Sequence, residues 1–221
     1  MPFNEDGFES LKDCIPEQSI VAIKKDISEK FIAPCRGGIR NAEKHFPTLN
    51  ALINSSHIIQ LANQYLTGQP SVVRTILFDK TPENNWLVSW HQDKTVAVSA
   101  PFEQDGWGPW SIKDGVHHVQ APVAALDRMV TLRIHLDPAD ESTGCLKVIP
   151  GSHRLGVLTQ HEIDIQRQQC QPVTCHASAG SILVMRPHLL HASSKASHPS
   201  SRKVIHVEYS DYSLPKGVSW A

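Results

Sequence analysis

Two histidines and an aspartate have the residue types of a metal site, although they lie far apart in the sequence. His91 and Asp93 follow a stretch at 86–90 whose β-branched and aromatic residues predict a strand. Because side chains at i and i+2 point to the same face of a strand, these two residues can bind one metal ion together. A third ligand must then come from elsewhere, and His191 is the candidate.

Two histidines and one carboxylate on one face of an ion, with the opposite positions open, are typical of non-haem Fe(II) oxygenases. The His-x-Asp triplet alone is weakly specific, because a chain with 13 histidines and 22 acids produces it by chance. A surface turn explains such a triplet equally well. The metal hypothesis therefore depends on the residues around His191.

The sequence around His191 predicts two strands and supplies a well-spaced cation. Residues 181–185 and 204–209 predict the strands, and the Ser/Lys/His/Pro composition of 193–201 predicts a loop. If the two strands pair as an antiparallel hairpin, His191 and Arg202 lie close together across the ladder. Arg202 can then pair with the far carboxylate of a dicarboxylate that chelates iron, and Ser193 can add a hydroxyl donor.

Taken together, these segments resemble the phytanoyl-CoA dioxygenase-like (PhyH) family of Fe(II)/2-oxoglutarate oxygenases. The matching pieces are Trp-His-Gln-Asp at 90–93, Gly-x-Leu-x-Val-x-Pro-Gly-Ser-His at 144–153, Ala-Gly-Ser at 179–181, His191-x-Ser193, and Arg202 eleven residues after His191. The resemblance extends from about Val72 to Tyr209. It is specific for the family and almost silent on the substrate.

The resemblance implies a mainly β fold with flanking helices and a double-stranded β-helix core of the jelly-roll or cupin-like type. It implies that His91, Asp93 and His191 are the iron ligands and that Ser193 and Arg202 hold 2-oxoglutarate. Fe(II), 2-oxoglutarate and O2 are then the cofactors, and a small-molecule substrate is hydroxylated with release of succinate and CO2. Halogenating relatives replace the aspartate that this chain retains, so hydroxylation is the default; desaturation, ring closure and epimerisation use the same ligands.

One strand departs from the family pattern. Many relatives carry an aromatic residue before the Gly-x-Leu turn, whereas this chain has Arg133 and His135 on one face of the predicted strand 129–136. We expect Arg133 and Lys80 to line the cosubstrate pocket. Together with these two cations, Lys94 and Arg186 favour a small-molecule substrate that is anionic or zwitterionic.

Other functions remain open. A zinc-dependent hydrolase or isomerase would use the same three ligands without 2-oxoglutarate or oxygen, and a non-catalytic cupin-like binding protein would have a vestigial site. The presence of Ser193 and Arg202 argues against the second. His188 is a rival third ligand, although its spacing to Arg202 fits the family less well. A separate zinc site is a further alternative, formed by Cys170, Cys175 and His176.

The composition favours a cytoplasmic enzyme of one domain, 1–221, whose residues 1–70 form a mostly helical part that braces the core. A net charge of −1 predicts no general attraction to nucleic acid or membranes, and no apolar run approaches the ~20 residues that span a bilayer. The acidic N-terminus lacks signal-peptide features. Five cysteines without a Cys-x-x-Cys pattern indicate reduced thiols. The sequence leaves the oligomeric state open.

Three expectations concern the flanking elements. Apolar spacing in 41–65 predicts an amphipathic helix or a broken pair, with Ser55 or Ser56 as a cap, and Pro122 predicts a short helix through Arg128. The Trp- and Gly-containing segment 102–110 indicates either a packed rim loop or a cover over substrate. Among the other histidines, His117 and His118 are candidates for a hydrogen bond to substrate, and His153 and His206 are expected to be structural.

Overall fold

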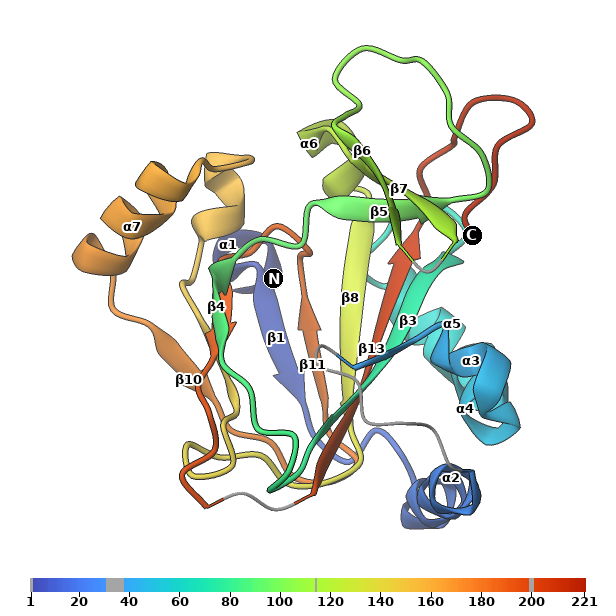
Figure 1. The fold of residues 1–221 in the computed structure, drawn as a ribbon, viewed down its shortest axis with the longest axis vertical. Coiled ribbons are helices and arrows are strands. Elements are labelled where there is room, and N and C mark those ends of the chain that lie inside the picture. Colours follow the sequence, from blue (N-terminus) through green and yellow to red (C-terminus); the bar gives the residue numbers. More distant parts are fainter. Residues whose placement is uncertain (1, 31–37, 114, 199–200) are drawn as a thin grey trace.

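The computed structural model describes residues 2–30, 38–113, 115–198 and 201–221, and these form three antiparallel sheets (Figure 1). The large sheet has the order β1 (Phe8–Leu11), β11 (Ile182–Met185), β8 (Met129–His135), β13 (Arg202–Ser210), β3 (Ser71–Lys80), β2 (Ile39–Arg40). The second sheet has the order β10 (Val173–Cys175), β9 (Leu146–Val148), β12 (His191–Ser193), β4 (Val88–His91). The third has the order β5 (Thr95–Val98), β7 (Val116–Gln120), β6 (Trp110–Lys113).

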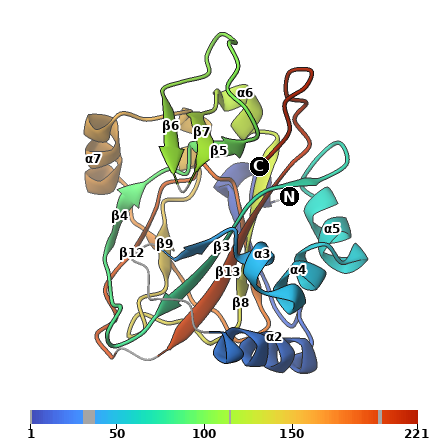
Figure 2. The ribbon, with the colours of Figure 1, turned by 45° about the vertical axis from the view of Figure 1, so that its right-hand side comes forward.

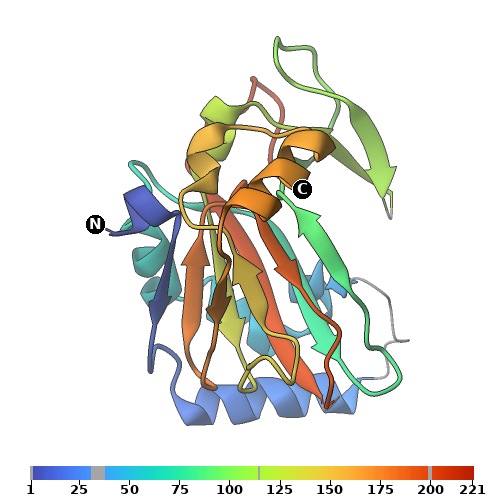
Figure 3. The ribbon, with the colours of Figure 1, turned by 90° about the vertical axis from the view of Figure 1, so that its left-hand side faces the viewer.

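The large and second sheets face each other, and Figure 3 shows the second sheet in front of the large one. Because side chains alternate across a strand, each strand of the large sheet presents one set of residues to the space between the sheets and the other set to its outer face. On β13, Arg202 and His206 line the inner space, whereas Ile205 and Val207 pack into the core on the outer side. This arrangement confirms the predicted mainly β fold with a double-stranded β-helix core.

Helices from the N-terminal part cover the outer face of the large sheet (Figure 2). They are α2 (Glu17–Glu29), α3 (Ala42–His45), α4 (Pro47–Ile53) and α5 (Ser56–Asn63). Fully buried Phe46, Leu49 and Ile58 of this segment share one hydrophobic cluster with Ile205 of β13. Burial of each such side chain contributes roughly 1.5–3 kcal/mol, so the helices stabilise the sheet by covering its apolar face.

The segment 41–65 contains three short helices, one more than the predicted broken pair. Pro47 is the first residue of α4, where its missing N–H costs no hydrogen bond, and this separates α4 from α3. Ser55 caps α5 as predicted, because its side chain accepts a hydrogen bond from the Ile58 amide at 3.4 Å. The N-terminal part also supplies the edge strands β1 and β2, together with helix α1 (Pro2–Asp6).

The predicted hairpin between residues 181–185 and 204–209 is wrong. β8 lies between β11 and β13 in the large sheet and pairs with both. Between β11 and β13 the chain crosses to the second sheet, forms β12 and returns, apart from residues 199–200, which lie outside the described part. His191 and Arg202 therefore belong to opposite sheets, and they approach each other across the interior rather than along a ladder.

The remaining helices and the third sheet surround one end of the two facing sheets (Figure 1). The helices are α6 (Val123–Leu126), which Pro122 precedes as cap, the 3-10 helix η1 (Ser152–Leu155), and α7 (Gln160–Gln169). In the rim segment 102–110, Phe102 makes edge-to-face contacts with Trp107 and Trp110, with ring centroids 5.0 and 5.3 Å apart, and the Trp107 ring centroid lies 5.8 Å from that of Tyr212. This segment packs on a hydrophobic cluster of the core. None of its described residues lines the cavity between the two facing sheets.

The four described cysteines (Cys14, Cys145, Cys170, Cys175) are free thiols, and Cys35 lies outside the described residues. The alternative zinc group at 170–176 is not among the clusters of described side chains close enough to share an ion. In the described ranges no helix has the length and apolar character needed to cross a membrane.

Candidate metal centre

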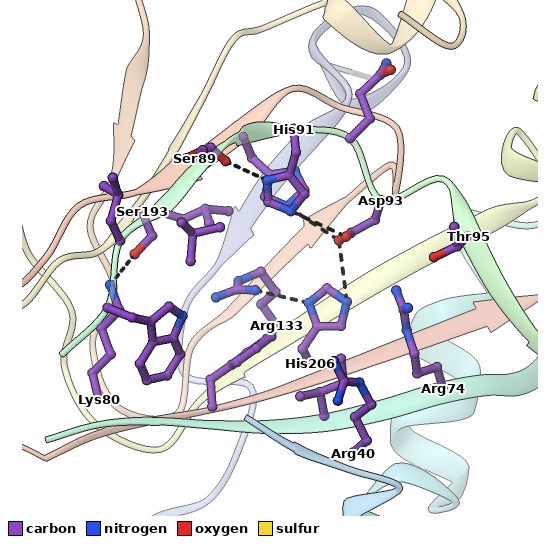
Figure 4. A pocket seen from close by; sticks show the side chains of 18 of the residues that line it. Arg40, Arg74, Lys80, Ser89, His91, Asp93, Thr95, Arg133, Ser193 and His206 are labelled. Atoms are coloured by element: carbon purple, nitrogen blue, oxygen red, sulfur yellow. Dashed lines mark hydrogen bonds and ion pairs between the residues drawn. The ribbon is translucent and has the colours of Figure 1, made fainter. Parts of the chain in front are cut away.

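A cavity of about 600 Å³ lies between the two facing sheets (Figure 4). One wall comes from β3, β8 and β13 of the large sheet, and the opposite wall comes from β4 and β12. The predicted site residues that line it are His91, Asp93, His191, Ser193, Arg202, Arg133 and Lys80. The fold thus brings all seven together, although they come from five separate segments of the chain.

His91, Asp93 and His191 converge at the top of this cavity. His91 and His191 occupy opposed positions on β4 and β12, with ring centroids 4.2 Å apart. Asp93 Oδ1 lies 3.5 Å from His91 Nε2, and Oδ2 lies 3.4 Å from His191 Nε2. One ligand atom from each residue falls within 4.8 Å of the other two, which is close enough to share one metal ion.

The backbone sets the tautomer of both histidines. His91 Nδ1 lies 2.8 Å from the Ser89 carbonyl oxygen, and His191 Nδ1 lies 2.8 Å from that of Leu189. A carbonyl only accepts hydrogen bonds, so each Nδ1 donates and, in the neutral ring, each Nε2 carries the free lone pair. Both lone pairs are therefore available on the Asp93 side, as metal ligation requires.

The charge states also suit a divalent cation. Burial opposes ionisation of Asp93, but His191 and His91 outweigh it and hold the pKa of this carboxyl well below its usual value. Burial and the neighbouring His91 lower the pKa of His191. Burial would also lower the pKa of His91, but its hydrogen bond to Asp93 raises it instead. Asp93 is therefore ionised and His191 neutral, as a metal requires, whereas His91 must release its more tightly held proton when a metal binds.

Three buried cations lie together in the same cavity as this triad. Lys80, Arg133 and Arg202 are 2%, 6% and 3% exposed, and Lys80 and Arg202 are directly opposed on β3 and β13. Burial together with Arg202 and Arg133 lowers the pKa of Lys80 to about 8, and burial with Arg202 lowers that of Arg133 to about 10. Arg202 Nε is buried without a hydrogen-bond partner among the described residues. Buried charge without compensation is costly, so this end of the cavity is built for an anion.

Ser193 positions Lys80 within the cation cluster. Its hydroxyl donates to the Gly144 carbonyl oxygen at 2.8 Å and accepts from Lys80 Nζ at 2.7 Å, while Lys80 also donates to the Ser194 carbonyl oxygen at 2.6 Å. The hydroxyl proton is thus committed to the backbone, in contrast to the free donor expected from the sequence. Gly144 has φ +70°, and a Cβ there would lie 2.5 Å from the Ser194 oxygen, which explains the glycine of the Gly-x-Leu motif.

His206, expected from the sequence to be structural, lines the cavity and borders the centre. Arg133 Nη1 lies 3.0 Å from His206 Nδ1, so Nδ1 accepts and Nε2 carries the proton, which it donates to Glu208 Oε1 at 3.1 Å. Its Nε2 lies 3.8 Å from Asp93 Oδ2. Asp93, His206 and Glu208 are also close enough to share an ion, but the protonated Nε2 has no lone pair to offer.

Two missed residues, Glu208 and Arg74, form an ion pair on adjacent strands of the same wall. The signal that points to these wall residues is their alternation with known site residues. His206 and Glu208 are four and six residues after Arg202 on one strand, and Arg74 is six residues before Lys80 on another.

Several residues singled out by the sequence lie elsewhere. His188 is fully buried with Nε2 3.3 Å from Asp127 Oδ1, outside the cavity, so it is not positioned as the third ligand. Arg186 donates to backbone carbonyls of Asp127 and Met129, and the expectation that it adds charge to the site is wrong. Lys94 does line the cavity.

The remaining histidines also lie away from the centre. His117 and His118 form part of β7, and neither lines the cavity. His135 lines a small separate cavity beside β11, and burial lowers its pKa to about 3. His153 is buried in η1. Of the two residues expected to share a pocket-lining face of β8, only Arg133 reaches the cavity.

Comparison with known families identifies the group to which this arrangement belongs. Residues 3–204 match the family described as phytanoyl-CoA dioxygenase (PhyH). The chain belongs to the PhyH family. PhyH enzymes use Fe(II), 2-oxoglutarate and O2, and the protein is accordingly a 2-oxoglutarate-dependent oxygenase by family. No curated protein sequence matches this PhyH chain closely enough to count as a relative.

Solved structures share the fold of this PhyH protein. AviO1 from Streptomyces viridochromogenes is 24% identical with a TM-score of 0.70, over 97% of this chain and 94% of that one. EctD from S. alaskensis, solved with 2-oxoglutarate and 5-hydroxyectoine, is 18% identical with a TM-score of 0.72, over 95% and 73%. The carbocyclase SnoK from nogalamycin biosynthesis is 15% identical with a TM-score of 0.69, over 95% and 81%.

Proposed function

We propose that this PhyH protein hydroxylates a small-molecule substrate and converts 2-oxoglutarate to succinate and CO2. The observation that carries the proposal is the placement of two different sites in one cavity. A triad of two histidines and a carboxylate lies beside a group of three buried cations. A divalent metal ion satisfies the first group, and a dicarboxylate that reaches the metal satisfies the second.

We assign His91 Nε2, Asp93 and His191 Nε2 as the iron ligands. These atoms lie within 4.8 Å of one another and their residues line the cavity, so ligands from solution can reach a metal ion held there. The hydrogen bonds from both Nδ1 atoms to backbone carbonyls fix the ring orientations. Such outer hydrogen bonds set both the tautomer and the geometry of the ligating rings.

We assign Arg202 and Lys80 to the far carboxylate of 2-oxoglutarate, with Ser193 holding Lys80 in place and Arg133 adding positive charge. Arg202 offers a planar fork of donors, and Lys80 lies opposite it on the neighbouring strand. EctD, a neighbour of the same fold, is described with 2-oxoglutarate bound and separately with iron bound. Those two EctD structures support, for this chain, the same pair of occupants.

Bound together, iron, 2-oxoglutarate and oxygen supply an oxidant able to insert oxygen into an unactivated C–H bond. The protein contributes by orienting the two ligands and by limiting the access of water. Phe78 and Trp86 form apolar parts of the cavity wall next to Lys80, whose Nζ lies 5.6 Å from the Trp86 ring centroid. A cavity of about 600 Å³ is of the size that takes small-molecule ligands.

Hydroxylation is the proposed outcome because the chain keeps Asp93 as an anionic ligand. Neighbours of the same fold include enzymes described as a carbocyclase and an epimerase, so the fold itself does not select one outcome. A zinc hydrolase or isomerase would use the triad but would leave the buried cations Lys80 and Arg202 without a role. The cation group thus favours the oxygenase over that alternative.

The test is an oxygen-free titration of the purified protein with Fe(II) and then with 2-oxoglutarate. We expect a metal-to-ligand charge-transfer absorption that saturates at one 2-oxoglutarate per iron, followed by succinate release when oxygen is admitted. Zn(II) in place of Fe(II) is the matched control and should give neither signal. Loss of 2-oxoglutarate dependence, with turnover of a substrate in the zinc form, would overturn the proposal in favour of a hydrolase.

A further inference from the structure

The cavity has a second positively charged end, distinct from the group that we assign to 2-oxoglutarate. In Figure 4, Lys80 and Ser193 lie on one side of the triad, while Arg74 and Thr95 lie on the other. Further cations line the cavity besides Arg74 and the Lys80 group: Arg40, Lys94 and Lys113.

The two ends are far enough apart to hold two separate ligands. Arg74 and Lys80 are six residues apart on β3, and a strand rises about 3.3 Å per residue, so their Cα atoms are separated by roughly 20 Å. Ile76 and Phe78 lie between them on the same face of the strand and also line the cavity. Along this face of β3 a cation lies at each end and two apolar side chains lie between them. An apolar part of a ligand would contact Ile76 and Phe78.

The charges in the cavity are unbalanced even after its expected occupants are counted. With Arg40 left out of the count, six of the described residues that line it are Lys or Arg and one, Asp93, is acidic. Iron brings two positive charges and 2-oxoglutarate brings two negative charges, so these occupants cancel each other. Glu208 forms an ion pair with Arg74 and so compensates one more positive charge, but the cavity lining still carries an excess of positive charge. The imbalance favours an anionic molecule in the part of the cavity that the cosubstrate does not reach.

Arg74 is built to receive such a group. Its side chain is only 11% exposed and is held by an ion pair from Nη2 to Glu208 Oε1, and Glu208 in turn accepts from His206. Its Nε is buried without a hydrogen-bond partner among the described residues. The guanidinium is therefore fixed through Nη2 at the cavity wall while its Nε–H has no partner among the described residues, and a planar fork of this kind recognises oxyanions.

We propose that the substrate of this protein carries an oxyanion group, of the carboxylate or phosphate type, and that Arg74 receives it at the end of the cavity opposite Lys80 and Arg202. Glu208 is the positioning residue that holds Arg74. This assignment rests on the proposed function, because it takes the other end of the cavity to be filled by 2-oxoglutarate. The oxidised carbon then belongs to the apolar part that lies over Ile76 and Phe78, next to the triad.

The experiment uses the full chain loaded with Fe(II) and saturating 2-oxoglutarate without oxygen, so that the Lys80 end is occupied. A panel of small carboxylates, phosphate monoesters and their uncharged amide or alcohol counterparts is screened by ligand-observed NMR. Fe(II) is paramagnetic, so protons of a molecule bound near the triad are selectively broadened. We expect binding and broadening for the acids and at least tenfold weaker binding for their neutral counterparts. The arms of the panel distinguish carboxylate from phosphate recognition.

Variants connect the binding to Arg74. Arg74→Gln should weaken binding of the acids at least tenfold, as expected for loss of a hydrogen bond to a charged group. Because this variant leaves the buried Glu208 without its guanidinium partner, the double variant Arg74→Gln/Glu208→Gln removes both charges and should show the same loss if the single variant does not fold. Arg167→Gln is the matched control, since the Arg167 side chain is 49% exposed on α7, does not line the cavity, and forms an ion pair with Asp164.

Two results would overturn the inference. One is that the acids bind no more tightly than their neutral counterparts, and the other is that the affinity for the acids is unchanged in the Arg74 variants. Failure of the proposed function gives a different result. The charge-transfer absorption of the Fe(II)–2-oxoglutarate complex is recorded for every sample. If it forms and the acids are not preferred, only the role of Arg74 is wrong. If it does not form in the wild-type protein, the assignment of the cosubstrate end is wrong.

Discussion

Lys80 and Arg202 occupy directly opposed positions on β3 and β13, so two buried cations from neighbouring strands face the same cavity. Like charges placed this way repel each other unless an anion lies between them. The triad of His91, Asp93 and His191 lies at the same cavity. The predictions below separate the contributions of the triad from those of the cations.

Removal of a triad residue should abolish metal binding. In His91→Ala and Asp93→Ala, loss of one of three ligands should eliminate iron retention and succinate formation while the protein still folds. Iron content after gel filtration and circular dichroism are the measurements. His161→Ala, at an exposed position on α7, is the matched histidine control and should keep its iron. Full iron occupancy in both triad variants would show that these residues are not ligands.

Asp93→Gly should open a position on iron to halide, because it removes the only anionic ligand that the protein supplies. We expect the hydroxylation rate to fall steeply and chloride to become detectable on iron by X-ray absorption spectroscopy. Bromide in place of chloride should shift the signal and so identifies the ligand. A variant that hydroxylates at the wild-type rate would be incompatible with Asp93 as a ligand.

Arg202→Ala should weaken 2-oxoglutarate binding by roughly ten- to several-hundred-fold, because hydrogen bonds to charged groups contribute about 1.5–3 kcal/mol each and about 1.4 kcal/mol is a tenfold change. Arg202→Lys keeps the charge but loses the planar fork, so its affinity should fall between the two. The midpoint of the oxygen-free charge-transfer titration measures this. Iron affinity should change little in either variant. Equal midpoints in all three proteins would remove Arg202 from the cosubstrate site.

The affinity for 2-oxoglutarate should decrease as the pH rises above about 8. Lys80 has its pKa lowered to about 8 by burial, Arg202 and Arg133, so it is charged below that pH and becomes neutral above it. The anion binds the charged form of Lys80 and therefore raises the pKa of Lys80 in the complex. Binding becomes weaker as the pH rises, because the free enzyme loses the Lys80 proton that the complex must regain. Lys80→Gln should bind 2-oxoglutarate more weakly at pH 7 and should lack this decrease. Titrations across the range at constant ionic strength test it, and a slope that persists in Lys80→Gln would assign it to another group.

Gly144→Ala should disturb both stability and cosubstrate binding. Its φ of +70° is unfavourable for alanine, and the new Cβ would lie 2.5 Å from the Ser194 oxygen and 3.2 Å from Lys80 Nζ. Gly217→Ala is the matched control, since its φ is +86° but no atom lies within 4 Å. Both variants should lose roughly 1–2 kcal/mol of unfolding free energy from the backbone alone. Only Gly144→Ala should lose more and also raise the 2-oxoglutarate midpoint; equal behaviour in urea unfolding and titration would contradict this.

The sequence by itself determined the family resemblance, which implies the fold class, and it pointed to residues that the structure brings together at one cavity. Alternating apolar residues predict strands, and His91, Asp93, His191, Ser193 and Arg202 lie in motifs whose spacing is local enough to be recognised. The helical character of 41–65 could also be predicted from the sequence, because amphipathic spacing and a serine cap are properties of a few consecutive residues. The extra helix boundary at Pro47 is visible in the sequence as well, although the apolar pattern continues through it.

The tertiary structure alone decided how these segments meet. The hairpin predicted for 181–185 and 204–209 would have kept His191 and Arg202 on one ladder, but β8, from a distant part of the chain, lies between the two strands. Strand pairing depends on contacts between residues far apart in the sequence, so local propensity does not specify it. The same limit explains why His206, Glu208 and Arg74 were missed and why Arg186 and His188 were misplaced: which face of a strand borders the cavity is set by the packing of one sheet against the other.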